Sequence, residues 1–241
     1  MVQKHALVQR EGFTIAGICN GSGMIAPNMG TMLSFIYTDV EVSAEHLHEA
    51  LKTAVKQGDA ALLKSCGKLI FWHTTCFASS RAEERVVRAF ISVHNHTVQT
   101  LAMQTAADGE GTTKMLEVHG SKGRAARRTP KRSRTYCDHI TACKEYGEDP
   151  NWSRVVCAAG CSGVEFAIDE LSLSIGENGS ETLLVQTGEN TADLVGAKAA
   201  MVGRHMVFTI TLEFGRKEAV AWGCDLTEKY VEIHQRRHNG R

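Results

Sequence analysis

The sequence lacks several features that would assign it to a special class of protein. It has no apolar run near the roughly 18 residues needed to cross a bilayer, and its opening, MVQKHALVQREGF, has no hydrophobic signal core. Its 27 lysines and arginines equal its 27 aspartates and glutamates, so no overall charge attracts it to nucleic acid or an anionic membrane. We therefore predict a soluble, non-secreted chain with no nucleic-acid or membrane partner.

Cysteine is also too sparse for a disulfide scaffold. The eight cysteines are scattered through 241 residues, and none form a CxxC pair. We expect free thiols in a reducing compartment. A metal site could join Cys137, His139 and Cys143, with His94 and His96 as further ligands, but this spacing matches no zinc pattern. The sequence favours buried thiols and surface histidines, and we predict no metal.

What remains is ordinary globular material, with 43% hydrophobic and 22% charged residues. Alternating or β-branched segments predict strands, and apolar residues at i, i+3 and i+4 predict helices. Residues 82–93 fit either type. We expect a mixed α/β layered fold in which Thr31 begins a buried central strand. The predicted strands lie in residues 5–19, 31–39, 68–77, 115–120, 170–175 and 205–215, and the predicted helices in residues 43–57, 98–107 and 190–201.

One segment departs abruptly in composition. Residues 121–136, SKGRAARRTPKRSRTY, carry seven lysines and arginines and no acidic residue. We interpret this segment as an exposed linker. The alternative is a polyanion-binding surface, which the lack of interleaved aromatic side chains disfavours.

The glycine-rich loop at residues 20–33, NGSGMIAPNMGTML, carries the sharpest chemical hypothesis. Its glycines and Pro27 allow a loop that is both bent and rigid. The hydroxyl of Thr31 could attack the strained carbonyl of Gly30, form an ester and cleave the chain. The new N-terminal threonine would carry its own base, because an α-amino group has a pKa of about 8. A plain glycine turn before a buried strand is the other interpretation.

Residues 21–39 closely resemble the processing site of the ornithine acetyltransferase family, the bifunctional enzymes of arginine biosynthesis also known as glutamate N-acetyltransferases. Three further blocks resemble the family in the same order, at residues 108–118, 146–166 and 219–233. The resemblance implies an α/β, N-terminal-nucleophile-type fold that lacks the N-terminal part of the family.

The resemblance also implies an activity. The chain would cut itself between Gly30 and Thr31, and Thr31 would then carry an acetyl group from N-acetylornithine to glutamate. Glu110 matches a family residue that binds substrate, and a carboxylate suits a substrate ammonium because charged hydrogen bonds are strong. Taken alone, Glu110 also fits a solvated turn acid.

Other matched residues are expected to shape the site. Pro150 keeps the GEDPNW segment from being helical, and Trp152 is expected to anchor packing. Cys224 and Asp225 match the family as well, but buried packing explains them as readily as chemistry does.

The resemblance implies four parts of the chain: a tail of the N-terminal (alpha) chain, the nucleophile-bearing part of the beta chain, a basic linker, and a C-terminal α/β part. It implies an alpha chain as partner, in a heterotetramer of two alpha and two beta chains. No cofactor is expected, with acetyl-CoA as a donor only where a synthase reaction operates. The expected location is the cytoplasm, or the mitochondrial matrix in a eukaryote. The four parts are residues 1–30, 31–120, 121–145 and 146–241.

Several features depart from the family. Its precursor has a long portion before the loop that supplies oxyanion-stabilising groups, which we expect to lie outside this chain. Asn20 replaces the lysine that opens the loop, and His234 replaces a substrate-contacting asparagine. Residues 58–80 and 121–136 match no family block. The alternative hypothesis is a decayed or truncated, non-catalytic relative that acts at most as an assembly partner.

Overall fold

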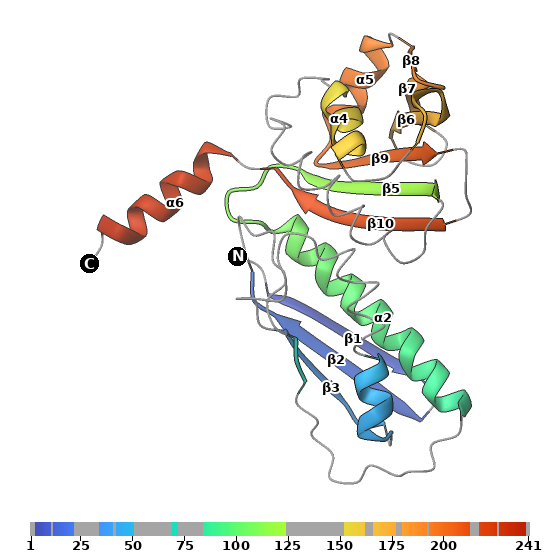
Figure 1. The fold of residues 1–241 in the computed structure, drawn as a ribbon. Helices are drawn as coiled ribbons and strands as arrows, with labels where there is room; N and C mark the ends of the chain where they lie inside the picture. Colours follow the sequence, from blue (N-terminus) through green and yellow to red (C-terminus); the bar gives the residue numbers. More distant parts are fainter. Residues whose placement is uncertain are drawn as a thin grey trace.

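The structure of the chain is a computed structural model in which two β-sheets are connected by a long helix that contacts both (Figure 1). The structure describes twelve segments of the chain. They are residues 3–10, 12–21, 34–40, 42–50, 69–71, 84–123, 152–161, 166–176, 180–191, 193–212, 217–225 and 227–239.

The first sheet has the strand order β1-β2-β3-β4. Strands β1 (Lys4–Arg10) and β2 (Phe13–Cys19) form an antiparallel hairpin in which Arg10 faces Phe13. Gly12 in the turn has φ 92°, a conformation that favours glycine. The prediction of a single strand at the start of the chain was therefore wrong, because this turn divides the apolar segment in two. Strand β3 (Ser34–Thr38) pairs antiparallel with β2, and β4 (Leu69–Phe71) pairs parallel with β3.

Helix α2 (Glu84–Ala107) packs on the first sheet and reaches the second. Phe90 is fully buried and meets the ring of Phe13 edge-on, with 6.3 Å between centroids. The same core includes Met115 and Trp222 from the second sheet, so one cluster of apolar side chains links both sheets through α2. This shared core fixes the position of the segment that follows the helix.

The second sheet has the order β10-β5-β9-β6-β7-β8. The neighbouring strands β5 and β9 run parallel, whereas all other neighbouring pairs in this sheet are antiparallel. The strands are β5 (Met115–Gly123), β6 (Leu171–Ile175), β7 (Thr182–Gln186), β8 (Glu189–Asn190), β9 (His205–Leu212) and β10 (Lys217–Cys224).

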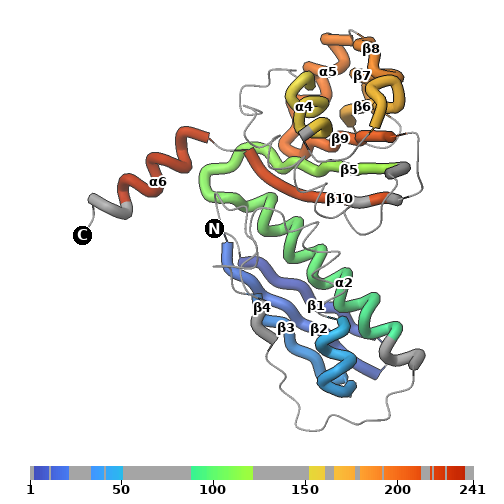
Figure 2. The backbone as a smooth tube through the Cα atoms, viewed as in Figure 1, coloured from blue at the N-terminus to red at the C-terminus, as the bar shows by residue number. Residues whose placement is uncertain are grey.

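One face of this sheet is covered by helices α4 (Ser153–Cys161) and α5 (Leu194–Met201). The core beneath them contains Leu116 and Val118 of β5, and Trp152 packs against it as predicted. A short 3-10 helix (Ile168–Glu170) precedes β6. The last helix, α6 (Glu228–Asn239), leaves the body after β10 and projects away from it (Figure 2).

Most of the predicted elements are confirmed. The strands predicted at 31–39, 68–77, 170–175 and 205–215 contain β3, β4, β6 and β9, and the mixed α/β class is correct. The strand predicted at 115–120 is the first part of β5, which continues to Gly123 into the segment that was predicted to be a linker. The helix predicted at residue 43 is described for residues 44–50, where the backbone N–H of His46 donates to Ser43 Oγ at 3.3 Å. The two segments at 82–93 and 98–107 join in the single helix α2.

Helix α5 differs from its prediction in how much of its apolar face is buried. In α5, Ala197 and Met201 are buried, but Leu194 is 54% exposed, so the predicted apolar face is narrower than expected. Most of the basic segment, residues 124–136, lies outside the described residues, and so do residues 137–150. No helix among the described residues is long and apolar enough to span a membrane.

We predict that Gly17→Val weakens the contact between β2 and α2. A Cβ at Gly17 would lie 2.9 Å from Leu101 Cδ1 and 3.0 Å from Thr97 Cγ2, so a larger side chain overpacks a buried interface. The free energy of unfolding should fall by about 1–3 kcal/mol in urea denaturation. Gly160→Ala in α4 is the control, because nothing lies within 4 Å of its Cβ, and it should stabilise by about 0.5–1 kcal/mol. Equal midpoints for wild type and Gly17→Val would contradict this packing.

Candidate functional site

The segment DGEGTTK at residues 108–114 connects α2 to β5, and we call it the Glu110 loop. It continues directly from the helix, since the N–H of Asp108 donates to the Gln104 carbonyl at 3.2 Å. It lies where α2, β5, β10 and α6 meet. Residues from each neighbouring element bind it, so its shape is set by tertiary contacts.

Asp225, just after β10, is the main anchor of this loop. Its carboxylate accepts hydrogen bonds from the backbone N–H groups of Thr113 and Lys114, at 2.9 and 3.0 Å. It also accepts from the hydroxyls of Thr112 and Thr113. Asp225 is 3% exposed, so four donors satisfy a buried carboxylate. The sequence pointed equally to packing and chemistry here, and the structure shows a polar clamp.

The two glycines beside Glu110 allow its neighbours to approach closely. A Cβ at Gly109 would lie 2.7 Å from Cys224 Sγ, and one at Gly111 would lie 2.8 Å from the backbone N of Tyr230. Gly111 also has φ 76°, which disfavours other residues. Its carbonyl accepts a 2.6 Å hydrogen bond from the hydroxyl of Thr227. The loop and the start of α6 therefore pack backbone to backbone.

Glu110 and His234 are brought together by this packing. His234 Nε2 donates to Glu110 Oε2 at 2.9 Å, and the ring of Tyr230 lies 4.3 Å from the imidazole. The Glu110 side chain is 13% exposed and that of His234 is 38% exposed. The family resemblance links both positions to substrate contact, although the family has an asparagine where this chain has His234, and the structure brings the two side chains together.

The other end of the loop is fixed as well. Lys114 is 5% exposed, and its Nζ donates to the carbonyls of Met201 and Gly203, at 2.6 and 3.2 Å. Lys4 of β1 forms an ion pair of 2.6 Å with Asp108. Ion pairs or hydrogen bonds thus reach the loop from both sheets.

Gly30 and Thr31, the predicted cleavage pair, lie outside the described residues, and so does most of the loop at 20–33. Its base is described: Cys19 pairs with Ser34 across β2 and β3. Cys19 Sγ lies 3.4 Å from Thr105 Oγ1, near the end of α2, and burial raises the pKa of this thiol. The base of the glycine-rich loop therefore lies beside the helix end that delivers Glu110.

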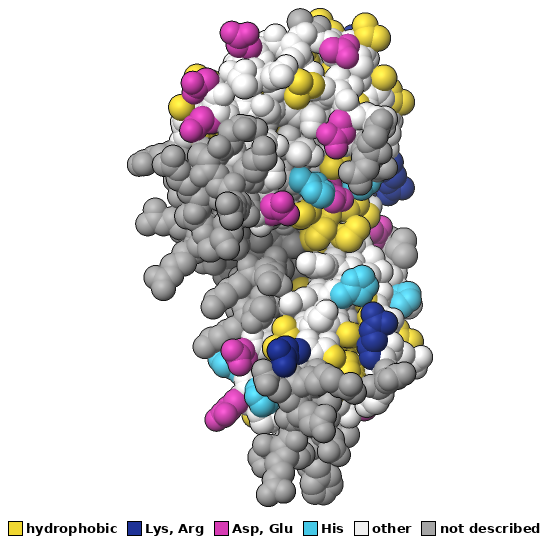
Figure 3. Space-filling model, turned by 90° about the vertical axis from the view of Figure 1, so that its right-hand side faces the viewer, with side chains coloured by type: hydrophobic (Ala, Val, Ile, Leu, Met, Phe, Trp, Pro, Cys, Tyr) yellow, Lys and Arg dark blue, Asp and Glu magenta, His cyan; other side chains and the backbone are white. Residues whose placement is uncertain are grey.

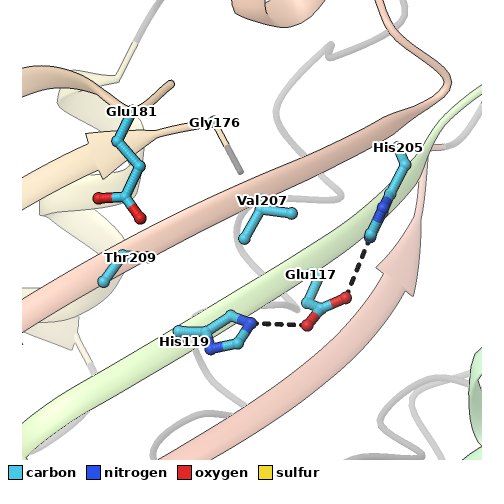
Figure 4. A pocket seen from close by; sticks show the side chains of 7 residues that line it. All are labelled: Glu117, His119, Gly176, Glu181, His205, Val207 and Thr209. Carbon is cyan, nitrogen blue, oxygen red and sulfur yellow. Dashed lines mark hydrogen bonds and ion pairs between the residues drawn. The ribbon is translucent and has the colours of Figure 1, made fainter. Parts of the chain in front are cut away.

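A second polar cluster lies on the face of the second sheet opposite α4 and α5. The space-filling view in Figure 3 shows histidine and acidic side chains beside hydrophobic ones midway along one side of the molecule. Figure 4 shows Glu117 between two histidines that approach its two oxygens, His119 at 2.6 Å and His205 at 3.0 Å. They line a hollow of about 270 Å³ with Glu181.

The charges of this cluster depend on each other. The hydrogen bond to Glu117 raises the pKa of His119 above its ordinary value, although burial acts in the opposite direction. Burial would raise the pKa of Glu117, but hydrogen bonding to His119 and the neighbouring charges outweigh it, and the pKa is lowered. The two imidazoles bind different oxygens of the same carboxylate, so their nitrogens do not point toward one common metal position. Among the described residues no group of three or more His, Cys, Asp or Glu is arranged for metal binding.

Two of the five metal ligands considered from the sequence, His94 and His96, lie among the described residues. Cys137, His139 and Cys143 lie outside the described residues. His96 is exposed as expected, but His94 is fully buried against Phe90, and burial lowers its pKa to about 4. The expectation that His94 lies on the surface was wrong, because it occupies the inner face of α2. Among the described residues, Cys19 and Cys157 form no disulfide, as expected for free thiols.

Comparison with known proteins identifies the family. The model of the ArgJ family matches residues 1–236. The chain belongs to the ArgJ family. It is 38% identical to the glutamate N-acetyltransferase of Methanosarcina mazei over 92% of this chain and 58% of the relative. It is 35% identical to the arginine biosynthesis bifunctional protein ArgJ 1 of Clostridium acetobutylicum over 97% of this chain and 60% of the relative.

This ArgJ-family chain therefore spans less than two thirds of the length of these curated relatives. It also resembles the crystal structure of the arginine biosynthesis bifunctional protein argJ from Bacillus halodurans, with a TM-score of 0.72 and 25% identity. That match covers 85% of this chain and 99% of the solved chain. The predicted family and its N-terminal-nucleophile-type fold are confirmed.

We predict that Asp225→Asn loosens the Glu110 loop. An asparagine amide would direct N–H donors at backbone donors, leaving buried groups unsatisfied, and the free energy of unfolding should fall by about 3 kcal/mol in urea denaturation. Asp193→Asn is the matched control. Asp193 caps α5 through a 2.9 Å bond from the Gly196 N–H, and asparagine caps about as well, so the loss should stay within about 0.5 kcal/mol. Similar losses for both variants would contradict the clamp.

We also predict a pH-dependent contribution from His119. Its raised pKa means that the pair stabilises the fold when His119 is protonated, and this is lost as pH rises through that pKa. It is lost again as pH falls through the lowered pKa of Glu117. His119→Gln should therefore lower the melting temperature more near pH 6 than near pH 8.5 (thermal denaturation). The difference should be small and should shrink in 1 M salt, because the imidazole is 40% exposed. The opposite pH trend would contradict the pairing.

Proposed function

We propose that this chain is the nucleophile-bearing part of an acetyltransferase that moves an acetyl group from N-acetylornithine to glutamate. The observation that carries the proposal is the Glu110 carboxylate, held on a clamped loop with an N–H donor 2.9 Å away. A substrate ammonium can take the place of that donor and form a charge-assisted hydrogen bond. The names of the relatives support the reaction class, since they include glutamate N-acetyltransferase.

Thr31 is the proposed nucleophile. Its hydroxyl attacks the Gly30 carbonyl, the peptide bond shifts to an ester, and water hydrolyses the ester to leave an N-terminal threonine. The freed α-amino group then accepts the hydroxyl proton as Thr31 attacks the acetyl carbonyl of N-acetylornithine. The same proton passes to the departing ornithine amine. The amine of glutamate attacks the acetyl ester next, which releases N-acetylglutamate and restores the threonine.

The position of the glycine-rich loop supports this location for the nucleophile. The base of the loop, at Cys19 and Ser34, lies beside the end of α2, close to the start of the Glu110 loop.

The remaining parts of the site belong to a partner in this proposal. Oxyanion-stabilising donors come from an N-terminal (alpha) chain, and two such pairs form a heterotetramer. The four-part division at residues 30, 120 and 145 stays a prediction. We place the reaction in the cytoplasm, or in the mitochondrial matrix of a eukaryote, with acetyl-CoA as donor only in a synthase reaction.

Two observations favour a second, non-catalytic function. His234 already bonds to Glu110, and Asn20 carries no charge to bind a substrate carboxylate; its amide donates to the Gly21 carbonyl at 3.2 Å. A chain with this pairing could keep the family fold and serve only as an assembly partner. The reconstitution experiment described next distinguishes the two functions.

The test combines the chain with the N-terminal half of the Methanosarcina mazei relative and measures N-acetylglutamate. The chain alone should remain at background, because losing even one oxyanion donor costs about a hundredfold to a thousandfold in rate. The mixture should be active, Thr31→Ala should abolish the activity, and Glu110→Gln should raise the KM for glutamate.

Intact mass serves as the second measurement of the same experiment. Wild type and Thr31→Ser should split between residues 30 and 31, and Thr31→Ala should stay whole. An uncut, inactive wild type in the presence of the N-terminal half would contradict the enzyme and favour the assembly partner.

A further inference from the structure

Lys4 makes a buried contact with the Glu110 loop, although Lys4 precedes the proposed cleavage site in the sequence and the loop follows it. Its side chain on β1 is 2% exposed, and its Nζ lies 2.6 Å from Asp108 Oδ2. Asp108 is two residues before Glu110. An ion pair therefore connects a lysine that lies before residue 30 in the sequence to the loop that would bind substrate, which lies after residue 30.

Strand β1 is held so that Lys4 can reach this position. The His5 N–H donates to Gln104 Oε1 at 2.8 Å, and Gln104 Nε2 donates to the His5 carbonyl at 2.9 Å. The α2 side chain thus pairs with the edge of β1 as a neighbouring strand would. On the other edge, Lys4 is in register with Cys19 of β2.

Asp108 occupies a place where a carboxylate needs a cation. It directly follows the C-terminus of α2, where the partial negative charge of the last carbonyls repels an anion. Helix α2 has no basic residue in its own last turn. Cations come from other elements: Lys4 binds Asp108, and Arg204 donates to the Ala107 carbonyl at 3.2 Å.

We propose that Lys4 is a positioning residue for Glu110, and that the segment before the cleavage site stays necessary for substrate binding after the chain is cut. Asp225 fixes the far end of the Glu110 loop, and the Lys4–Asp108 pair fixes the near end. Glu110 lies between these two anchors. Without the Lys4–Asp108 pair, the Glu110 carboxylate can move relative to the nucleophile. A displacement of about 1 Å can cost about a hundredfold in rate. The effect on substrate rests on the proposed function.

The test uses Lys4→Met, which keeps most of the length of the side chain but removes its charge. In the mixture with the N-terminal half, the KM for glutamate should rise at least about tenfold, with a smaller change in kcat. Lys4→Arg should restore part of the binding. Because Lys4 acts through Glu110, adding Lys4→Met to Glu110→Gln should have little further effect, which a general loss of folding would not reproduce.

Gln104→Ala is the matched control. It removes both hydrogen bonds between α2 and the β1 backbone but leaves the Lys4–Asp108 ion pair. It should change the KM much less than Lys4→Met does. Equal effects would overturn the proposal and leave β1 as a purely structural strand.

Hydrogen exchange of the chain without any substrate separates this inference from the proposed function. Lys4→Met and Asp108→Asn should each speed the exchange of amides at 109–114, with little change in β9. Asp108→Asn keeps the test valid if Lys4→Met fails to fold. Unchanged loop exchange in a folded variant would overturn the positioning role, even if the wild-type mixture is inactive.

Discussion

The buried carboxylate of Asp225 is the interaction on which the site depends. It accepts four hydrogen bonds from a stretch of three residues, and it comes from the strand next to the one that this stretch enters. A carboxylate with this many donors is satisfied without water, so it fixes backbone as well as side chains. The loop keeps its shape because β10 and β5 are already paired, which makes the site a consequence of sheet formation.

The shared core around α2 extends this dependence to the first sheet. Apolar side chains of both sheets pack in one cluster with the helix, so the end of α2 has a defined position relative to β1, β2 and β3. The hairpin before the proposed cut and the strand after it are paired over five residues, from Ile15–Thr38 to Cys19–Ser34. The proposed cut would break one peptide bond between them and would leave this pairing intact, so the two resulting chains would stay associated.

Two polar features of this chain each place a histidine against a buried or half-buried carboxylate. His234 lies on α6, a helix that touches the body through its first turns, and it meets Glu110 there. The Glu117 cluster lies on the face of the second sheet opposite α4 and α5. There the imidazoles of His119 and His205 share one carboxylate. In the first case the imidazole would compete with the proposed substrate ammonium for the same oxygen, whereas in the second the pair of His119 and Glu117 stabilises the charge of both partners.

The sequence by itself determined the class of fold, the family and many of the strands, because apolar periodicity is a local property; β9, which alternates throughout, was found at its full length. It identified Glu110 and position 234 only through a resemblance. It missed the single helix α2, since polar His94 and Thr97 occupy its buried face and break the pattern. Only the tertiary structure decided the contacts of the site: Lys4–Asp108, Thr112–Asp225 and Glu110–His234 join residues 104, 113 and 124 positions apart. Such pairs have no local signal, because strand order and helix packing bring them together.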